Sequence, residues 1–225
     1  MAMSPDVTEK MFGVPYKIRD LQAYVRDSGY GSDAWKVRAV DALAQRLRYS
    51  QGNSVYAYRF DWDELRKVLT LDLAQLFGAA HALEIPFVFG NFDLIDRTMV
   101  VSGEAIPARD ALSASMMSYW AEFAHRGNPG RGRDGREVEW TSWENGAESR
   151  NRLLIFDSSN DGGVRMSSLR MTQESIRTRL LADTSFADQE DHCAAYRQLF
   201  DGDDFVRSEY RTLGHAGCVV EQTHE

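Results

Sequence analysis

The segment that most limits the fold of this chain is "SVYAYRFD", residues 54–61, which is apolar almost without interruption. Valine and aromatic residues dominate it and turn-forming residues precede it, a pattern typical of a strand. A strand that is apolar on both faces needs cover on both faces, so we expect an interior strand with flanking helices. The sequence therefore predicts an α/β fold with few strands.

Apolar residues recur at helical spacing in several stretches, which predict helices. We expect one from Asp33 to Leu47 with one buried face, formed by Trp35, Val40, Leu43, Ala44 and Leu47. A second is expected around 71–77, ended by Gly78. The remaining expected helices cover 113–124, 172–182 and 188–200. The 113–124 helix should pack through the set Met116, Met117, Trp120, Phe123 and Ala124.

The second half of the chain also contains a hairpin signal and a polar loop. "RLLIFDSSNDGGVRM" predicts a strand, a turn on Asp161-Gly162-Gly163 and a short return strand. The arginine-rich "RGNPGRGRDGREVE" contains acids as well, and we expect a solvated loop there. We expect residues 1–200 to form one part of the chain and residues 201–225 an acidic, weakly patterned and loosely ordered tail.

Composition excludes several classes of partner. The formal net charge of −8 argues against nucleic acid, which requires a basic surface. No run approaches the roughly 18 apolar residues of a membrane span, and the first 15 residues carry no targeting pattern. Cys193 and Cys218 allow one optional disulfide. The chain contains no HxxxH or CxxC spacing that would indicate a metal site, and we expect no metal ion and no cofactor.

His81 is the residue that most needs an explanation, because it stands just before the apolar run "IPFVF" in "GAAHALEIPFVFG". We expect that run, residues 85–89, to form a buried strand with Phe87 and Phe89 in the core. His81 then has three possible roles: a catalytic base, a metal ligand, or a core residue. On spacing alone the core role is favoured, since no G-x-S-x-G nucleophile motif occurs in the chain; "GNSVY" at 52–56 lacks the second glycine.

The amino-acid sequences of several motifs favour the catalytic role of His81 over the core role. "FGAAHALEIPFVFGNFD" resembles the segment that carries the catalytic histidine in type-B carboxylesterases, the cholinesterase-like branch of the α/β-hydrolase fold. "SVYAYRFDW" resembles the strand upstream of that histidine, and "MMSYWAEFAHRGNP" the helix downstream of it. "VEWTSW", "LLIFD" and "DHCAAYRQLF" follow in the order of the family. The resemblance runs from about Trp35 to about Phe200.

The resemblance implies a carboxylic-ester hydrolase in which His81 is the histidine of a Ser-acid-His triad and Glu84 a supporting carboxylate. In this family the serine and the acid precede the histidine, so both are expected upstream, outside this chain. Residues 1–200 then correspond to the C-terminal part of an α/β-hydrolase catalytic domain, with an incomplete sheet. The implied partners are a small neutral ester and the N-terminal portion of the same enzyme.

Two alternatives remain open at this stage. A cholinesterase-like module that binds without catalysis, or an inactive truncated gene product, explains the missing serine without a partner. A self-contained α/β domain of unrelated function is the other alternative. Whichever holds, the chain alone is expected to be inactive as an esterase, because the members of a triad act as a unit.

Overall fold

The computed structural model describes residues 7–93, 95, 100–146 and 148–219. They form two compact units. Unit 1 contains Met1–Asp20 and Leu43–Leu169, and unit 2 contains Leu21–Ala42 and Arg170–Glu225. Each unit has its own hydrophobic core.

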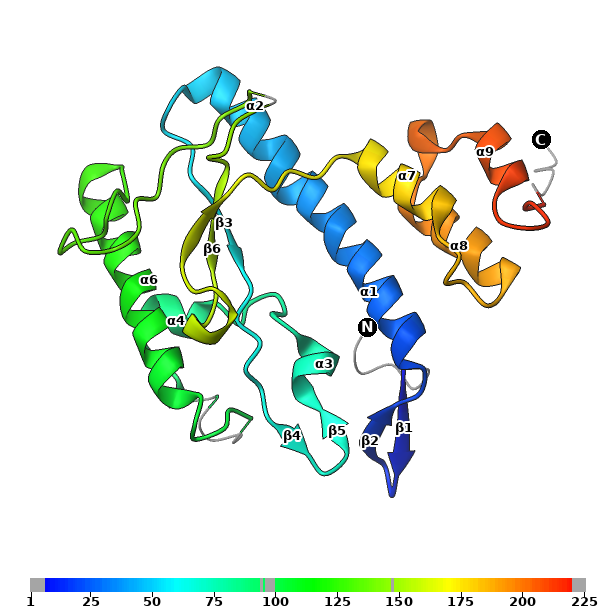
Figure 1. Cartoon of the computed structure of the whole chain (residues 1–225), viewed down its shortest axis with the longest axis horizontal. Coiled ribbons are helices and arrows are strands. Elements are labelled where there is room, and N and C mark those ends of the chain that lie inside the picture. The colour runs from blue at the N-terminus through cyan, green and yellow to red at the C-terminus, as the bar shows by residue number, and fades with distance from the viewer. Residues whose placement is uncertain (1–6, 94, 96–99, 147, 220–225) are drawn as a thin grey trace. The chain divides into compact units, whose positions relative to one another are not determined.

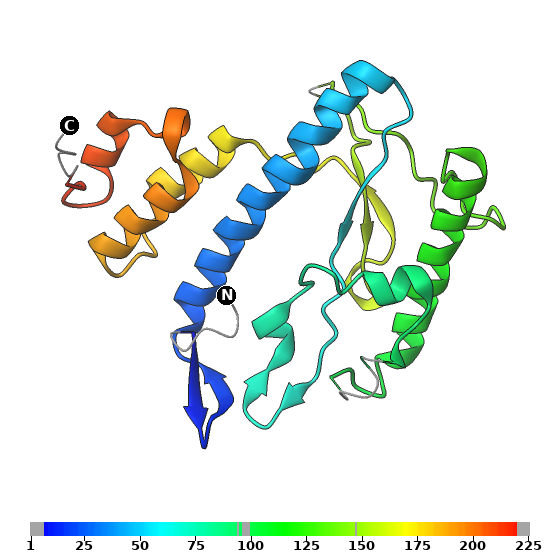
Figure 2. The ribbon, with the colours of Figure 1, turned by 180° about the vertical axis from the view of Figure 1, so that it is seen from behind.

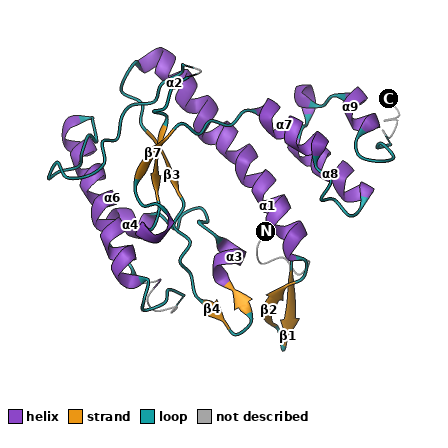
Figure 3. Ribbon diagram, in the orientation of Figure 1, coloured by secondary structure: helices purple, strands orange, loops and turns teal. Residues whose placement is uncertain are grey.

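Unit 1 contains the described strands and the helices that pack on them (Figure 3). Its strands are β1 (Thr8–Met11), β2 (Val14–Ile18), β3 (Ala57–Phe60), β4 (Lys67–Val68), β5 (Leu71–Asp72), β6 (Leu153–Phe156) and β7 (Arg165–Ser167). Its helices are α2 (Ala42–Gln51, of which Ala42 falls in unit 2), α3 (Leu73–Phe77), α4 (Ile85–Phe89), α6 (Ile106–Arg126) and the short η2 (Ser159–Asp161).

The central sheet of unit 1 has the order β3-β6-β7. β3 runs parallel to β6, with Ala57 opposite Leu153 and Phe60 opposite Phe156, and β7 is antiparallel to β6. Parallel neighbours require a long crossover, and here the connection carries α3, α4 and α6. Figure 1 and Figure 2 both show α4 and α6 beside this sheet. The strand and hairpin predictions are confirmed in type, but β3 is an edge strand among the described residues rather than an interior one.

The turn of the hairpin explains why its sequence signal is reliable. Gly162 and Gly163 have φ values of 96° and 62°, a region that costs a side-chain-bearing residue energy. Ser158 begins the turn, where its Oγ accepts a hydrogen bond from the Asn160 N–H at 3.2 Å. The sequence "SSNDGG" therefore fixes the reversal between β6 and β7.

An aromatic cluster lies between the sheet and α6. The ring of Phe156, which is fully buried, lies 5.6–5.9 Å from those of Tyr58, Tyr119, Trp120 and Trp140. The face of α6 that enters this cluster overlaps the predicted one only in part. Met116 is buried and Trp120 packs against the cluster, as predicted. Met117 and Phe123 are 39% and 45% exposed, contrary to the prediction, whereas Leu112 and Tyr119 are buried. Tyr119 can be buried because its ring packs on Phe156 and its hydroxyl donates a hydrogen bond to the Val138 carbonyl.

Unit 2 is helical, with α1 (Leu21–Lys36), η1 (Val37–Asp41), α7 (Gln173–Ala182), α8 (Gln189–Leu199), η3 (Gly202–Asp204) and α9 (Arg207–Thr212). α7 and α8 confirm the two predicted C-terminal helices. The helix expected to begin at Asp33 begins instead at Leu21, and its helical residues continue without a break to Gln51. Trp35 and Leu43 are 57% and 50% exposed, so the prediction is wrong for these two residues, whereas Ala44 is buried as predicted. The other buried apolar residues of this helical run are Tyr30, Ala34 and Val37.

The described part of the C-terminal tail, residues 201–219, is more ordered than its weak pattern predicts. It contains α9, and Tyr210 and Leu213 are buried. Cys193 of α8 and Cys218 form a disulfide, with a Cα–Cα distance of 5.8 Å. The cross-link and these buried side chains supply the order that hydrophobic periodicity did not reveal.

Removal of the Phe156 ring should destabilise unit 1. We expect Phe156→Ala to lower the free energy of unfolding by about 3–5 kcal/mol, because the ring leaves a cavity within the aromatic cluster. Phe89→Ala is the matched control, since Phe89 is 74% exposed, and should change stability by less than about 0.5 kcal/mol. Urea denaturation followed by fluorescence measures both; equal losses would contradict this description of the core.

The disulfide should stabilise unit 2. It joins residues 25 apart in sequence, and closing a loop of that size contributes about 3.5 kcal/mol in the chain-entropy model. Dithiothreitol should therefore lower the thermal midpoint of the unmodified chain. The double variant Cys193→Ala, Cys218→Ala should start lower and show no response to the reductant. An unmodified chain whose midpoint ignores the reductant would argue against the cross-link.

Candidate active-site segment

His81 lies in a turn between α3 and α4, in the segment that begins at Gly78 and ends at Gly90. Gly78 ends α3 as the sequence predicts, with φ 53° and its N–H donating to the Ala74 carbonyl at 2.7 Å. The turn then continues through Ala82, whose φ of 73° is unusual for a residue with a side chain. The side chain of His81 is exposed. The segment thus presents an imidazole at the surface of unit 1.

The apolar run after His81 forms helix α4 rather than the predicted strand. Pro86 lies in the first turn of α4, where a missing N–H costs nothing, and Gly90 ends the helix in the left-handed conformation with φ 60°. A short apolar run does not distinguish a strand from a buried helix by periodicity alone, which is why the prediction failed.

Phe87 anchors α4 to the core of unit 1. Its side chain is fully buried, and its ring lies 5.0 Å from those of Phe60 and Trp62 and 5.1 Å from that of Phe92. The prediction for Phe87 is confirmed. The prediction for Phe89 is wrong, because one helical turn carries only one of the two rings inward.

A hydrogen bond connects α4 to α6. Ser113 is 2% exposed, and its Oγ donates to the Phe87 carbonyl at 2.8 Å. The carbonyl of a one-turn helix has few other partners, so this bond satisfies a buried acceptor. Together with the Phe87 ring, it fixes the segment on the C-terminal side of His81.

Glu84 stands immediately before α4 and is half-buried. Its side chain makes no capping hydrogen bond to the helix. Burial raises the pKa of Tyr58 on β3, and the negative charge of Glu84 raises that pKa further. The carboxylate therefore acts electrostatically on the neighbouring strand.

Sequence reasoning missed a group of acidic side chains beyond the carboxyl ends of β3 and β6. Asp61 and Asp157 follow the two strands directly, which is the signal that could have found them. Burial raises the pKa of Asp157, and Asp61 adds to that effect. Both are ion-paired: Asp61 with Arg59, and Asp157 with Arg165 at 3.4 Å. These pairs brace the strand ends.

The other described histidines and the acidic groups do not assemble a metal site. His192 is buried, with Nε2 2.9 Å from the Leu180 carbonyl and its ring stacked on Phe186 at 4.2 Å. His125 lies exposed at the end of α6. Within the described ranges no group of three His, Cys, Asp or Glu side chains is arranged to hold a metal ion. Likewise, none of the described helices has the length and apolarity to cross a membrane.

Comparison with known proteins identifies the family. The family model described as "Carboxylesterase family" matches residues 18–174, and the chain belongs to that family. This confirms the resemblance drawn from the motifs, although the match begins before Trp35 and ends before "DHCAAYRQLF". The family implies an α/β-hydrolase fold, with which the mixture of helices and small sheets agrees.

Three curated relatives illustrate the range of the similarity. The chain is 33% identical over 117 residues to a para-nitrobenzyl esterase of Bacillus subtilis, covering 52% of this chain and 21% of the relative. It is 38% identical over 98 residues to an acetylcholinesterase of Danio rerio, 42% of this chain and 14% of that protein. It is 29% identical over 125 residues to a medium-chain fatty acyl-CoA hydrolase precursor of Anas platyrhynchos, 55% and 21% respectively. The chain thus spans about a fifth or less of these relatives.

The Ser113 hydrogen bond can be tested directly. Ser113→Ala should lower the free energy of unfolding by about 1–3 kcal/mol, because it leaves the buried Phe87 carbonyl unsatisfied. Amide hydrogen exchange should also speed up in α4. Ser115→Ala, on the same helix, is the control and should stay within about 0.5 kcal/mol. Unchanged exchange in α4 for the Ser113 variant would rule out the bracing role.

Proposed function

We propose that this protein takes part in the hydrolysis of carboxylic esters, with His81 as the general base of a Ser-acid-His triad. The observation that carries the proposal is the family match over residues 18–174, which includes the His81 segment. Two relatives are named as an esterase and an acyl-CoA hydrolase. The exposure of His81 on a braced turn supports the role, because a base must reach both a nucleophile and a substrate.

In the proposed reaction His81 accepts and then returns protons. One ring nitrogen takes the proton of a serine hydroxyl as the serine oxygen attacks the ester carbonyl, and the imidazolium then protonates the departing alkoxide. In the second half, His81 takes a proton from water, which attacks the acyl-enzyme; the imidazolium then returns a proton to the departing serine oxygen as the carboxylic acid is released. A carboxylate on the other ring nitrogen holds the tautomer. The expected substrate is a small neutral ester.

The serine and the triad acid belong, in this proposal, to polypeptide outside this chain. The chain has no G-x-S-x-G motif and covers 21% or less of the relatives described above. Residues 1–200 then form the C-terminal portion of a catalytic domain, and the N-terminal portion is the partner. By itself the chain is nearly inactive.

Exposed apolar surface supports a covering partner for unit 1. Large apolar side chains on its surface include Phe12, Leu69 and Phe89, which are 97%, 79% and 74% exposed. β3 pairs with β6 on one side only among the described strands. A strand edge and apolar side chains of this kind are normally covered in a native protein.

Glu84 has a supporting role in this proposal. It is three residues from His81, on the turn that presents the imidazole, and its charge acts on Tyr58 of β3. The carboxylate stabilises the arrangement of the turn and the strand, while proton transfer stays with His81.

The role of His81 is tested in a longer polypeptide, in which the region encoded directly upstream precedes this chain. The chain alone should hydrolyse a short-chain p-nitrophenyl ester at the background rate, and the longer protein should be active. His81→Ala in the longer protein should lower kcat by about 10⁴- to 10⁶-fold, because the triad acts as a unit.

His125→Ala is the matched control, since His125 is also an exposed histidine of unit 1. It should leave kcat within about twofold of the unmodified protein. Activity that survives His81→Ala would refute the proposed base. Activity of the chain alone, abolished by His81→Ala, would retain the base and refute the external serine.

A further inference from the structure

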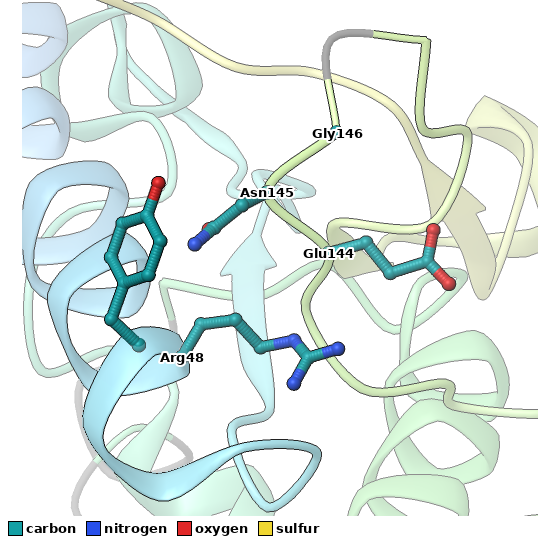
Figure 4. A pocket seen from close by; sticks show the side chains of 5 residues that line it. Arg48, Glu144, Asn145 and Gly146 are labelled. Carbon is teal, nitrogen blue, oxygen red and sulfur yellow. The ribbon is translucent and has the colours of Figure 1, made fainter.

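A cavity of about 430 Å³ lies where the end of α2 meets the segment before β6. It is lined by Arg48, Tyr49, Glu144, Asn145 and Gly146, all of unit 1 (Figure 4). No residue of the His81 segment lines it. Its volume falls in the range of sites that accept small molecules, about 300–1,000 Å³.

The wall formed by residues 144–146 is held firmly in place. Arg152 is 3% exposed, and its guanidinium donates to the carbonyls of Glu144 at 2.7 Å and Gly146 at 2.5 Å. Asn145 spans the cavity to α2, where its Nδ2 donates to the Gln45 carbonyl at 3.3 Å. The cavity therefore lies between fixed elements, as a preformed binding site requires.

Arg48 and Asn145 supply the polar donors of the lining. The Nε of Arg48 is itself buried, and it has no hydrogen-bond partner within the part of the chain that the structure describes. Asn145 carries a second Nδ2 hydrogen besides the one on the Gln45 carbonyl. Figure 4 shows both side chains extending into the space between α2 and the 144–146 segment. Buried donors without acceptors are rare in native proteins and call for an explanation.

The single carboxylate in the lining does not supply that acceptor. Glu144 accepts a hydrogen bond from the Ser149 Oγ at 2.6 Å, and its carboxylate points away from Asn145 in Figure 4. Tyr49 adds an aromatic ring that is 79% exposed and so is open to an apolar group. The cavity thus combines a cation, an amide donor and an aromatic surface, beside the Glu144 carboxylate that accepts from Ser149.

We infer that this cavity binds the carboxylate of a small organic acid. The Arg48 guanidinium and the Asn145 amide receive the carboxylate oxygens, and the apolar part of the acid lies against the Tyr49 ring. A planar guanidinium matches a carboxylate in charge and in geometry, which makes the pair a strong charge-assisted contact. The inference rests on the cavity alone and does not depend on the proposed esterase function.

Benzoate is the probe, because it joins a carboxylate to an aromatic ring. Isothermal titration calorimetry with the full chain should give saturable 1:1 binding with a Kd below about 10 mM. Arg48→Gln should weaken binding at least about tenfold, since it removes a charged donor. Arg48→Lys keeps the positive charge but loses the paired N–H donors of the planar guanidinium, and should weaken binding by about three- to fivefold.

Two controls separate this site from non-specific binding. Arg46→Gln changes an exposed arginine of the same helix that is not in the lining, and should leave the Kd within about twofold. Benzamide, which has the same shape without the charge, should bind at least about tenfold more weakly than benzoate. Absence of benzoate binding, equal losses in the Arg46 and Arg48 variants, or equal affinity for benzamide would each overturn the inference. Unchanged thermal midpoints of the variants exclude misfolding as the cause of lost binding.

Discussion

The packing of aromatic rings around Phe156 and Phe87 is the interaction on which unit 1 depends. Phe156 ends β6 and contacts rings from β3, α6 and the loop that carries Trp140. Phe87 extends the same core to α4, since both residues belong to one cluster of buried side chains. The three-stranded sheet is small, so these rings rather than strand pairing hold the helices against it. The turn that carries His81 leads directly into α4, which is anchored in this way.

Sequence signals with a local physical cause predicted structure well. Gly78 and the "SSNDGG" turn specify backbone conformations that depend only on their neighbours. The predictions that failed concern tertiary contacts. Periodicity gave no means of choosing between Trp35 and Ala34 as the inward side of a helix, or between a strand and a helical turn for residues 85–89.

The two proposed sites divide in the same manner. The role of His81 was proposed from the resemblance of its segment to the family, whereas its spacing favoured a core residue; in the structure the residue is exposed. The cavity beside Arg48 had no sequence signal, because it joins α2 to residues about a hundred positions later through the Asn145–Gln45 hydrogen bond. Polar groups brought together over such a distance emerge only from the folded chain.

The central claim is that the core-anchored turn presents His81 to a serine supplied by polypeptide outside this chain. A crystal structure of the longer protein tests it most directly, through the distance from the nearer His81 ring nitrogen to the Oγ of the G-x-S-x-G serine. The account predicts a separation of about 2.6–3.2 Å, the reach of a hydrogen bond between base and nucleophile. A structure in which another histidine contacts that serine while His81 faces solvent would contradict it.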